Sequence, residues 1–146
     1  MDLVNGVPRS PYESMHGIVF LPRAIDKVRA EIAGALGDYI SRTFFSGMLL
    51  EFLGIEPQDF VDAVAARDSD EEVWAWVKAR MRPRSATEIM AFNHEMMTRT
   101  PDDDAARERF WQFMADIGQS HRTDVSRQFD RLDLDEGRDV PLGGRQ

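Results

Sequence analysis

Apolar residues recur every three or four positions through most of the chain, with polar residues between them. This spacing places apolar side chains along one face of an α-helix. The clearest stripe lies in residues 22–37, which begin with a proline and end with a glycine. Proline suits the first helical turn, and glycine suits the left-handed residue after a helix. Residues 22–36 are therefore predicted to form a charged amphipathic helix that ends at Gly37.

Further apolar stripes follow this helix and are separated by short polar connections. They occupy residues 45–52, 60–64, 73–81, 89–96, 106–117 and 125–132. Ser69 and Ser85 each precede a glutamate by three residues, which is the pattern of a helix-capping box. The chain is therefore predicted to be all-α, a single compact domain of six to seven short helices.

The chain ends lack helical periodicity. Residues 1–17 are rich in Pro, Gly, Ser and Asn, and we expect an extended N-terminal arm that packs on the helical domain, residues 18–139. The four apolar residues 18–21 are long enough for one short strand, but no second strand is evident to pair with them. We interpret them as apolar chain leading into the first helix. Residues 140–146 are expected to fray.

Composition narrows the classes of partner. The 146 residues carry 26 acidic and 18 basic side chains, a formal net charge of −8, so the chain would on average repel nucleic acid. No apolar run approaches the ~20 residues that span a bilayer, and we expect a cytoplasmic protein without membrane contact. The absence of cysteine excludes disulfides, thiolate metal sites and cysteine nucleophiles.

Known catalytic and metal motifs are incomplete in this chain. His94-Glu95 begins like the helical zinc motif, but Thr98 stands where the second histidine is required. There is no nucleophile elbow, dinucleotide loop or phosphate-binding loop. The C-terminal acidic run fails as a calcium loop, because leucines stand where oxygen ligands are needed. The sequence therefore predicts no metal and no cofactor.

Asp135 and Glu136 in that acidic run allow two interpretations. They could bind a hard cation loosely, because carboxylate oxygens suit such ions. Alternatively, one of them pairs with an arginine such as Arg9 or Arg23 and clasps the two ends of the chain together.

Five stretches of the sequence resemble one known family. They read PRSPYE, GIVFLPRAIDKVRAEIAGALGDY, FLGIEP, SDEEVWAWV and DRLDLDEGRDVP. In content and order they are similar to the family catalogued as domain of unknown function 5069, and they cover most of the chain. The resemblance implies a small bacterial, mostly helical domain and no particular activity. Family members often place cysteines near the second helix, where this chain has Met48, Leu49 and Leu50, so no thiol-based role follows.

The first helix and the arm before it supply the main candidate binding residues. Arg9, Arg23 and Arg29 could form a cationic lip, because the planar fork of arginine matches carboxylate and phosphate groups. The alternative is a solvated helix face with weak ion pairs.

Three more residues are candidates for the lining of a pocket. Asn93 lies near the centre of its helix stripe, so it is either a satisfied core amide or a pocket group. Tyr39 and Trp111 offer aromatic surface with a polar tip. With the three arginines they predict an inter-helix pocket for a small anionic metabolite.

Whether the protein is an enzyme stays open. A hydrolytic or isomerising step would need a general base, and the weak candidates are His94, Asp135 and Glu136. The alternative function is an interaction or assembly module that uses methionine and tryptophan surface, including Trp74 and Trp111, to form a homodimer or bind a partner helix.

Overall fold

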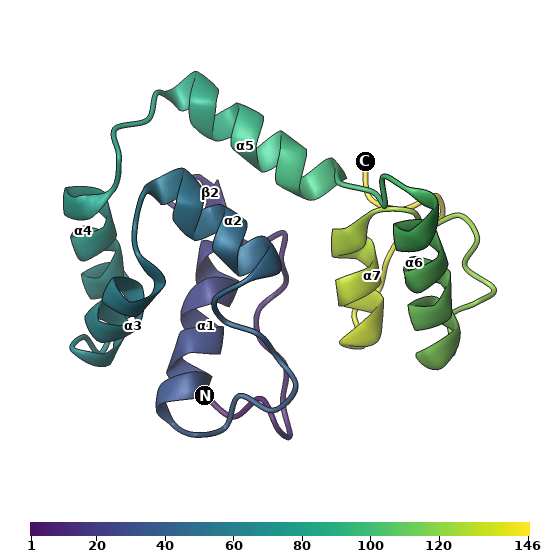
Figure 1. The fold of residues 1–146 in the computed structure, drawn as a ribbon, viewed down its shortest axis with the longest axis horizontal. Coiled ribbons are helices and arrows are strands. Elements are labelled where there is room, and N and C mark those ends of the chain that lie inside the picture. The colour runs from purple at the N-terminus through teal and green to yellow at the C-terminus, as the bar shows by residue number, and fades with distance from the viewer. The chain divides into compact units, whose positions relative to one another are not determined.

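The computed structural model describes residues 1–146 and contains seven helices and one two-stranded sheet (Figure 1). The predicted all-α class is confirmed, and none of the seven helices has the length and apolar character that crossing a membrane requires. The chain divides into two compact units, Met1–Asn93 and His94–Gln146. Each unit is described by itself below.

The helix positions follow the apolar stripes closely. The first unit contains α1 (Leu21–Ile32), α2 (Phe44–Leu53), α3 (Pro57–Ala65), α4 (Asp70–Arg80) and the start of α5 (Ala86–Thr98). The second unit contains the end of α5, then α6 (Asp104–Asp116) and α7 (Gln128–Asp135). Both predicted capping boxes are present, with the amides of Glu72 and Glu88 donating to the hydroxyls of Ser69 and Ser85 at 3.1 Å.

The end of α1 differs from the prediction. The helix stops before Gly34, whose φ of 69° allows the left-handed turn, and not before Gly37. The Gly34 amide donates to the Glu31 carbonyl at 3.0 Å, and the Ala35 amide donates to the Ala30 carbonyl at 2.8 Å. These two bonds satisfy carbonyls that the helix end would otherwise leave unpaired. The chain therefore turns at Gly34, three residues before the glycine that the apolar stripe indicated.

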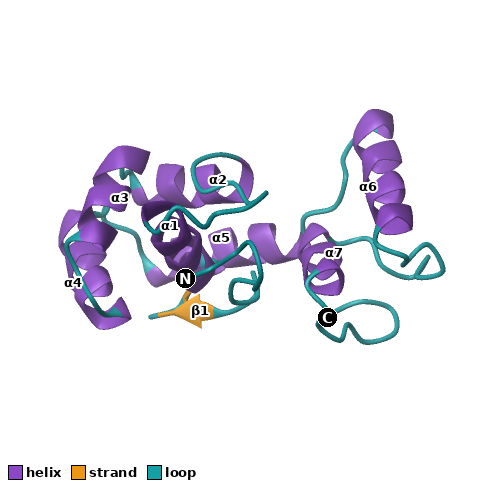
Figure 2. Cartoon of the chain, turned by 90° about the horizontal axis from the view of Figure 1, so that it is seen from below, coloured by secondary structure: helices purple, strands orange, loops and turns teal.

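A short hairpin precedes α1. Strands β1 (Ser14–Met15) and β2 (Ile18–Val19) are antiparallel, and Figure 2 shows the strand structure as a small element among helices. The register pairs Ser14 with Val19 and Met15 with Ile18. His16 and Gly17 both have positive φ, as a two-residue hairpin turn requires. The interpretation of residues 18–21 as unpaired chain was therefore wrong for β2, because its partner strand has only two residues and is too short to show periodicity.

Helix α1 is the centre of the first unit. It packs against α3, and α3 packs against α4. The buried apolar side chains of this unit include Phe20, Ile25, Val28, Leu49, Leu53, Phe60, Val64, Val73 and Val77. The charged residues Arg23, Asp26 and Lys27 of α1 are also buried, so the polar face of α1 is covered by protein and is not a solvated face.

The second unit has a small core of its own. Phe110 and Met114 of α6 pack with Val125 and Val140, and Ile117 and Leu134 border this cluster. Because Val140 lies in the C-terminal tail, the tail forms part of the core.

Backbone hydrogen bonds hold the rest of this tail, for which we expected fraying. The Gly143 amide donates to the Asp124 carboxylate at 2.7 Å, and the Arg145 amide donates to Asp130 at 3.1 Å. The acceptors are acidic side chains that lie well before the tail in the sequence, and the periodicity of apolar residues does not reveal such contacts.

Candidate functional site

Arg9 of the predicted cationic lip connects the N-terminal arm to two helices. Its guanidinium donates to both carboxylate oxygens of Asp26 at 3.0 Å and to Asp70, the first residue of α4, at 2.8 Å. Burial lowers the pKa of Arg9, but the hydrogen bonds to Asp26 and Asp70 outweigh burial, so the pKa lies above its ordinary value. Arg9 therefore stays charged and is engaged by protein carboxylates.

Arg23 and Tyr39, two more predicted site residues, pack against each other in the first unit. The Arg23 side chain is fully buried and donates to the Arg9 carbonyl at 3.1 Å. Its guanidinium carbon lies 5.7 Å from the Tyr39 ring centroid and 5.8 Å from that of Phe20. The Lys27 ammonium lies 5.2 Å from the Phe20 ring.

The structure thus brings Arg9, Arg23 and Tyr39 together in one cluster. The sequence prediction missed Lys27 as a member, although Lys27 follows Arg23 by one helical turn and so shares its face. Because Arg23 is inaccessible to solvent, the cluster stabilises the interior through cation–π contacts and is not an open anion site.

Arg29 and Asn93 bond to the backbone of other segments. Arg29 donates to the Arg67 carbonyl, just after α3, at 3.2 Å. The Asn93 side chain donates to the Gly17 carbonyl at 2.7 Å and accepts from the Val19 amide at 3.1 Å. Of the two interpretations of Asn93, the satisfied amide agrees with this geometry, and Asn93 fastens α5 to the hairpin.

The other predicted site residues belong to the second unit and are dispersed within it. His94 and Asp135 are exposed, and Trp111 is 38% exposed with its ring edge-on to Phe110. Glu136 pairs with Arg138, two residues further along the chain. No group of three or more His, Asp or Glu side chains is arranged to hold a metal ion.

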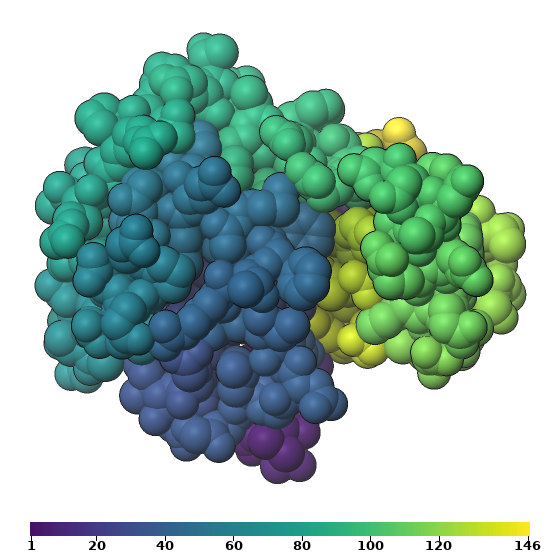
Figure 3. All heavy atoms as spheres, viewed as in Figure 1, coloured from purple at the N-terminus to yellow at the C-terminus, as the bar shows by residue number.

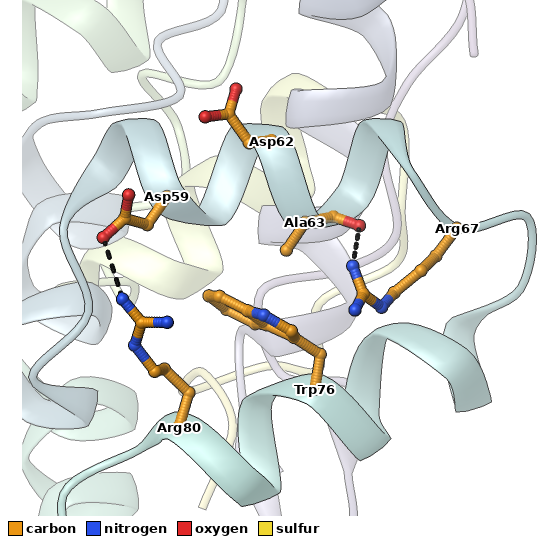
Figure 4. A pocket seen from close by; sticks show the side chains of 6 residues that line it. All are labelled: Asp59, Asp62, Ala63, Arg67, Trp76 and Arg80. Atoms are coloured by element: carbon orange, nitrogen blue, oxygen red, sulfur yellow. Dashed lines mark hydrogen bonds and ion pairs between the residues drawn. The ribbon is translucent and has the colours of Figure 1, made fainter.

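An open cleft of about 240 Å³ lies between α3 and α4 of the first unit. It is lined by Asp59, Asp62, Ala63, Arg67, Trp76 and Arg80 (Figure 4). The sequence analysis missed this cleft. A signal was present, because Asp59 and Ala63 on α3, like Trp76 and Arg80 on α4, are four residues apart and so share a helix face.

Two guanidinium groups approach one indole ring in this cleft. The guanidinium carbon of Arg67 lies 5.9 Å from the Trp76 ring centroid, and that of Arg80 lies 5.7 Å from it. Arg80 also faces Asp59 at 3.4 Å. These distances are within the range of cation–π attraction, which holds both cations beside the aromatic wall.

Arg67 is the least compensated charge of the cleft. It donates one hydrogen bond, to the Ala63 carbonyl at 3.0 Å, and it has no carboxylate within ion-pair distance. A guanidinium has five N–H donors, so most of its hydrogen-bonding capacity is unused by the protein. The cleft therefore offers directed donors and positive charge to an anion.

Comparison with known proteins places the chain in a family. The sequence profile described as "Domain of unknown function (DUF5069)" matches residues 5–138. The chain belongs to this family. The match confirms the resemblance seen in the sequence, and the DUF5069 description assigns no activity. No curated protein is significantly similar to the chain. Any function for this DUF5069 member therefore has to be argued from its own residues.

Proposed function

We propose that the protein binds a small anionic metabolite in the cleft between α3 and α4. The observation that carries this proposal is the Arg67 guanidinium, which lies beside Trp76 in an open cleft without a carboxylate partner. Arginine forks recognise carboxylate and phosphate groups through paired hydrogen bonds. We also infer a cytoplasmic bacterial setting, a prediction that rests on the sequence and the family resemblance alone.

The volume of the cleft limits the ligand. At about 240 Å³ it is smaller than the roughly 300–1,000 Å³ of sites that hold drug-sized molecules. Its lining combines charged groups with a single aromatic wall, which suits a compact polar metabolite. The proposal is one of binding, and it assigns no reaction.

Two residues of the predicted cationic lip support the cleft and do not line it. Arg29 donates to the Arg67 carbonyl and so holds the chain where the cleft arginine is attached. Arg9 bonds to Asp70 and so holds the first turn of α4, the helix that carries Trp76 and Arg80. The proposed ligand is still a small anion, as the sequence predicted. The arginine proposed to contact it is Arg67 in place of the arginines of the predicted cationic lip.

Titration of Trp fluorescence with inorganic phosphate and with small carboxylic acids tests the proposal. In a Trp74→Phe, Trp111→Phe background, Trp76 is the remaining tryptophan and reports on its own cleft. Arg67→Gln should weaken binding of an anion by at least about tenfold, the cost of losing a charge-assisted hydrogen bond. The matched control is Arg109→Gln, which removes the same charge at an exposed position of α6.

The outcomes are distinct once circular dichroism has shown that both variants are folded. A selective loss in Arg67→Gln supports the proposed site. Equal affinity of Arg67→Gln and the wild-type protein for every anion tested, or no binding by either protein, would reject it.

A second candidate function is self-association, and Phe44 at the start of α2 favours it. Its side chain is 75% exposed and its φ is 53°, a conformation that is unfavourable for a bulky residue. Helix α2 forms part of the surface shown in Figure 3. An exposed aromatic ring held on strained backbone suits a contact with a second copy of the chain.

Analytical ultracentrifugation over a range of protein concentrations tests this second candidate. Self-association predicts that the mass rises with concentration for the wild-type protein and stays monomeric for Phe44→Asn. Asparagine tolerates positive φ, so the variant removes the ring without adding backbone strain. A wild-type protein that is monomeric at all concentrations rules out the candidate.

A further inference from the structure

We propose that the ligand of the α3–α4 cleft is an acidic amino acid. Such a molecule has an ammonium group and a carboxylate on one carbon and a second anionic group at the other end. This inference rests on the proposed function, because it requires that the cleft bind anions at all. It adds the charge pattern of the ligand and assigns a role to each end of the cleft.

The first end of the cleft is the pair of Arg80 and Asp59. Their contact of 3.4 Å is longer than the ~2.7–2.9 Å of a strong charge-assisted hydrogen bond. Both side chains are about half exposed, at 59% and 47%, and neither has another ion-pair partner. An exposed pair of this kind contributes little to stability, so both groups keep capacity for a ligand.

This pair matches the head group of an amino acid. A ligand ammonium is a pure donor and needs an acceptor such as the Asp59 carboxylate. A ligand carboxylate is a pure acceptor and needs donors such as the Arg80 guanidinium. Because Asp59 and Arg80 lie side by side, they can bind the two groups that lie side by side on the α-carbon of an amino acid (Figure 4).

The second end of the cleft is Arg67. Figure 4 shows Trp76 between Arg80 and Arg67, with the indole forming a wall between the two guanidinium groups. Arg67 has no carboxylate partner, and an additional anionic group on the ligand would supply one. The apolar face of Trp76 suits the methylene groups that connect the two ends of such a ligand.

The charges of the cleft favour this ligand over a simple dianion. The two arginines and two aspartates of the lining cancel in charge. Without Asp62, the groups nearest Trp76, which are Arg67, Arg80 and Asp59, carry one net positive charge, and an acidic amino acid carries one net negative charge. A dicarboxylate without an ammonium would place a second carboxylate next to Asp59 and be repelled. Asp62 is set apart, because its side chain points away from Trp76 in Figure 4 and accepts from Gln58 at 2.9 Å.

The test compares three probes by isothermal titration calorimetry: L-glutamate, N-acetyl-L-glutamate and glutarate. The two derivatives keep the terminal carboxylates and lack the ammonium. We expect glutamate to bind the wild-type protein at least about tenfold more tightly than either derivative, because an unpaired Asp59 carboxylate disfavours both. Asp59→Asn should abolish this preference, while Asp102→Asn, a matched control at an exposed position outside the cleft, should preserve it.

The outcomes separate this inference from the proposed function. If glutarate or phosphate binds in an Arg67-dependent manner but glutamate has no advantage, the proposed function stands and the amino acid inference is overturned. The inference is also overturned if Asp59→Asn keeps the wild-type preference. If none of the probes binds, both fail. Should Asp59→Asn be unfolded, Asp59→Ser provides the same test, because it also removes the carboxylate that would accept from the ligand ammonium.

Discussion

The Asp26 carboxylate accepts three hydrogen bonds from Arg9, a residue seventeen positions earlier in the chain. The backbone amide donates at 2.8 Å, and Nε and Nη2 donate at 3.0 Å. The Asp26 side chain is only 5% exposed, whereas that of Arg9 is 35% exposed. A buried carboxylate on α1 thus binds the N-terminal arm through both the backbone amide and the side chain of Arg9.

Arg9→Ala should destabilise the fold substantially. The variant leaves the Asp26 carboxylate buried without its cationic partner, which typically costs about 3–5 kcal/mol. Partial exposure of Arg9 places the expected loss at the lower end of that range. Urea unfolding followed by circular dichroism measures it. Arg42→Ala is the control, because the exposed Arg42–Glu31 pair should contribute less than about 1 kcal/mol. Similar losses in the two variants would contradict the expectation.

Asn93→Ala should loosen the hairpin before α1. It removes the donor to the Gly17 carbonyl and the acceptor for the Val19 amide, and we expect a loss of about 1–2 kcal/mol. Faster amide exchange at Val19 would locate the effect in β2. Gln112→Ala, which removes an exposed amide on α6, should change stability by less than about 0.5 kcal/mol. Unchanged protection of Val19 would show that Asn93 does not hold the hairpin.

Gly34→Ala should destabilise the end of α1 by about 1 kcal/mol. The cause is the backbone alone, since an added Cβ at Gly34 would meet no atom within 4 Å while φ is 69°. Gly34→Asn should lose less, because asparagine adopts the left-handed conformation more readily. Thermal unfolding ranks the three proteins. An alanine variant as stable as the wild-type protein would mean that α1 does not end at this turn.

The attachment of the C-terminal tail should weaken in acid. Hydrogen bonds from Arg122 and from the Gly143 amide hold the pKa of Asp124 below its ordinary value of 3.8. A depressed carboxyl pKa contributes stability above pH 3.8, and this contribution is lost as the pH falls from 3.8 toward the folded-state pKa. Exchange of the Gly143 amide proton should therefore accelerate below that pH, after correction for the intrinsic rate.

The control for this pH effect is Asp124→Asn. The variant cannot titrate at this position, so the corrected Gly143 exchange should be fast and nearly independent of pH. A wild-type protein whose corrected exchange is unaffected by acid would show that the Asp124 carboxylate does not hold the tail.

The candidate site was only partly predictable from the sequence. Arginine was the expected anion-binding residue, but the stripe of α1 could not show that Arg23 is buried under Phe20 and Tyr39. Trp76 has the sequence position of a core residue, and its role as a cleft wall depends on α3 lying beside α4. Contacts between residues of different helices depend on which helices pack together. A single sequence does not show which helices these are.

The sequence by itself determined the all-α class, the order of the helices and most of their ends. Periodicity, capping serines and terminal glycines act within a few residues of one another, so they can be read without knowing the fold. Tertiary structure alone decided the strand partner in the hairpin, the burial of Arg23 and the pairing of Arg80 with Asp59. Each of these depends on packing between segments, because burial and ion pairing follow from distance in space and not from distance along the chain.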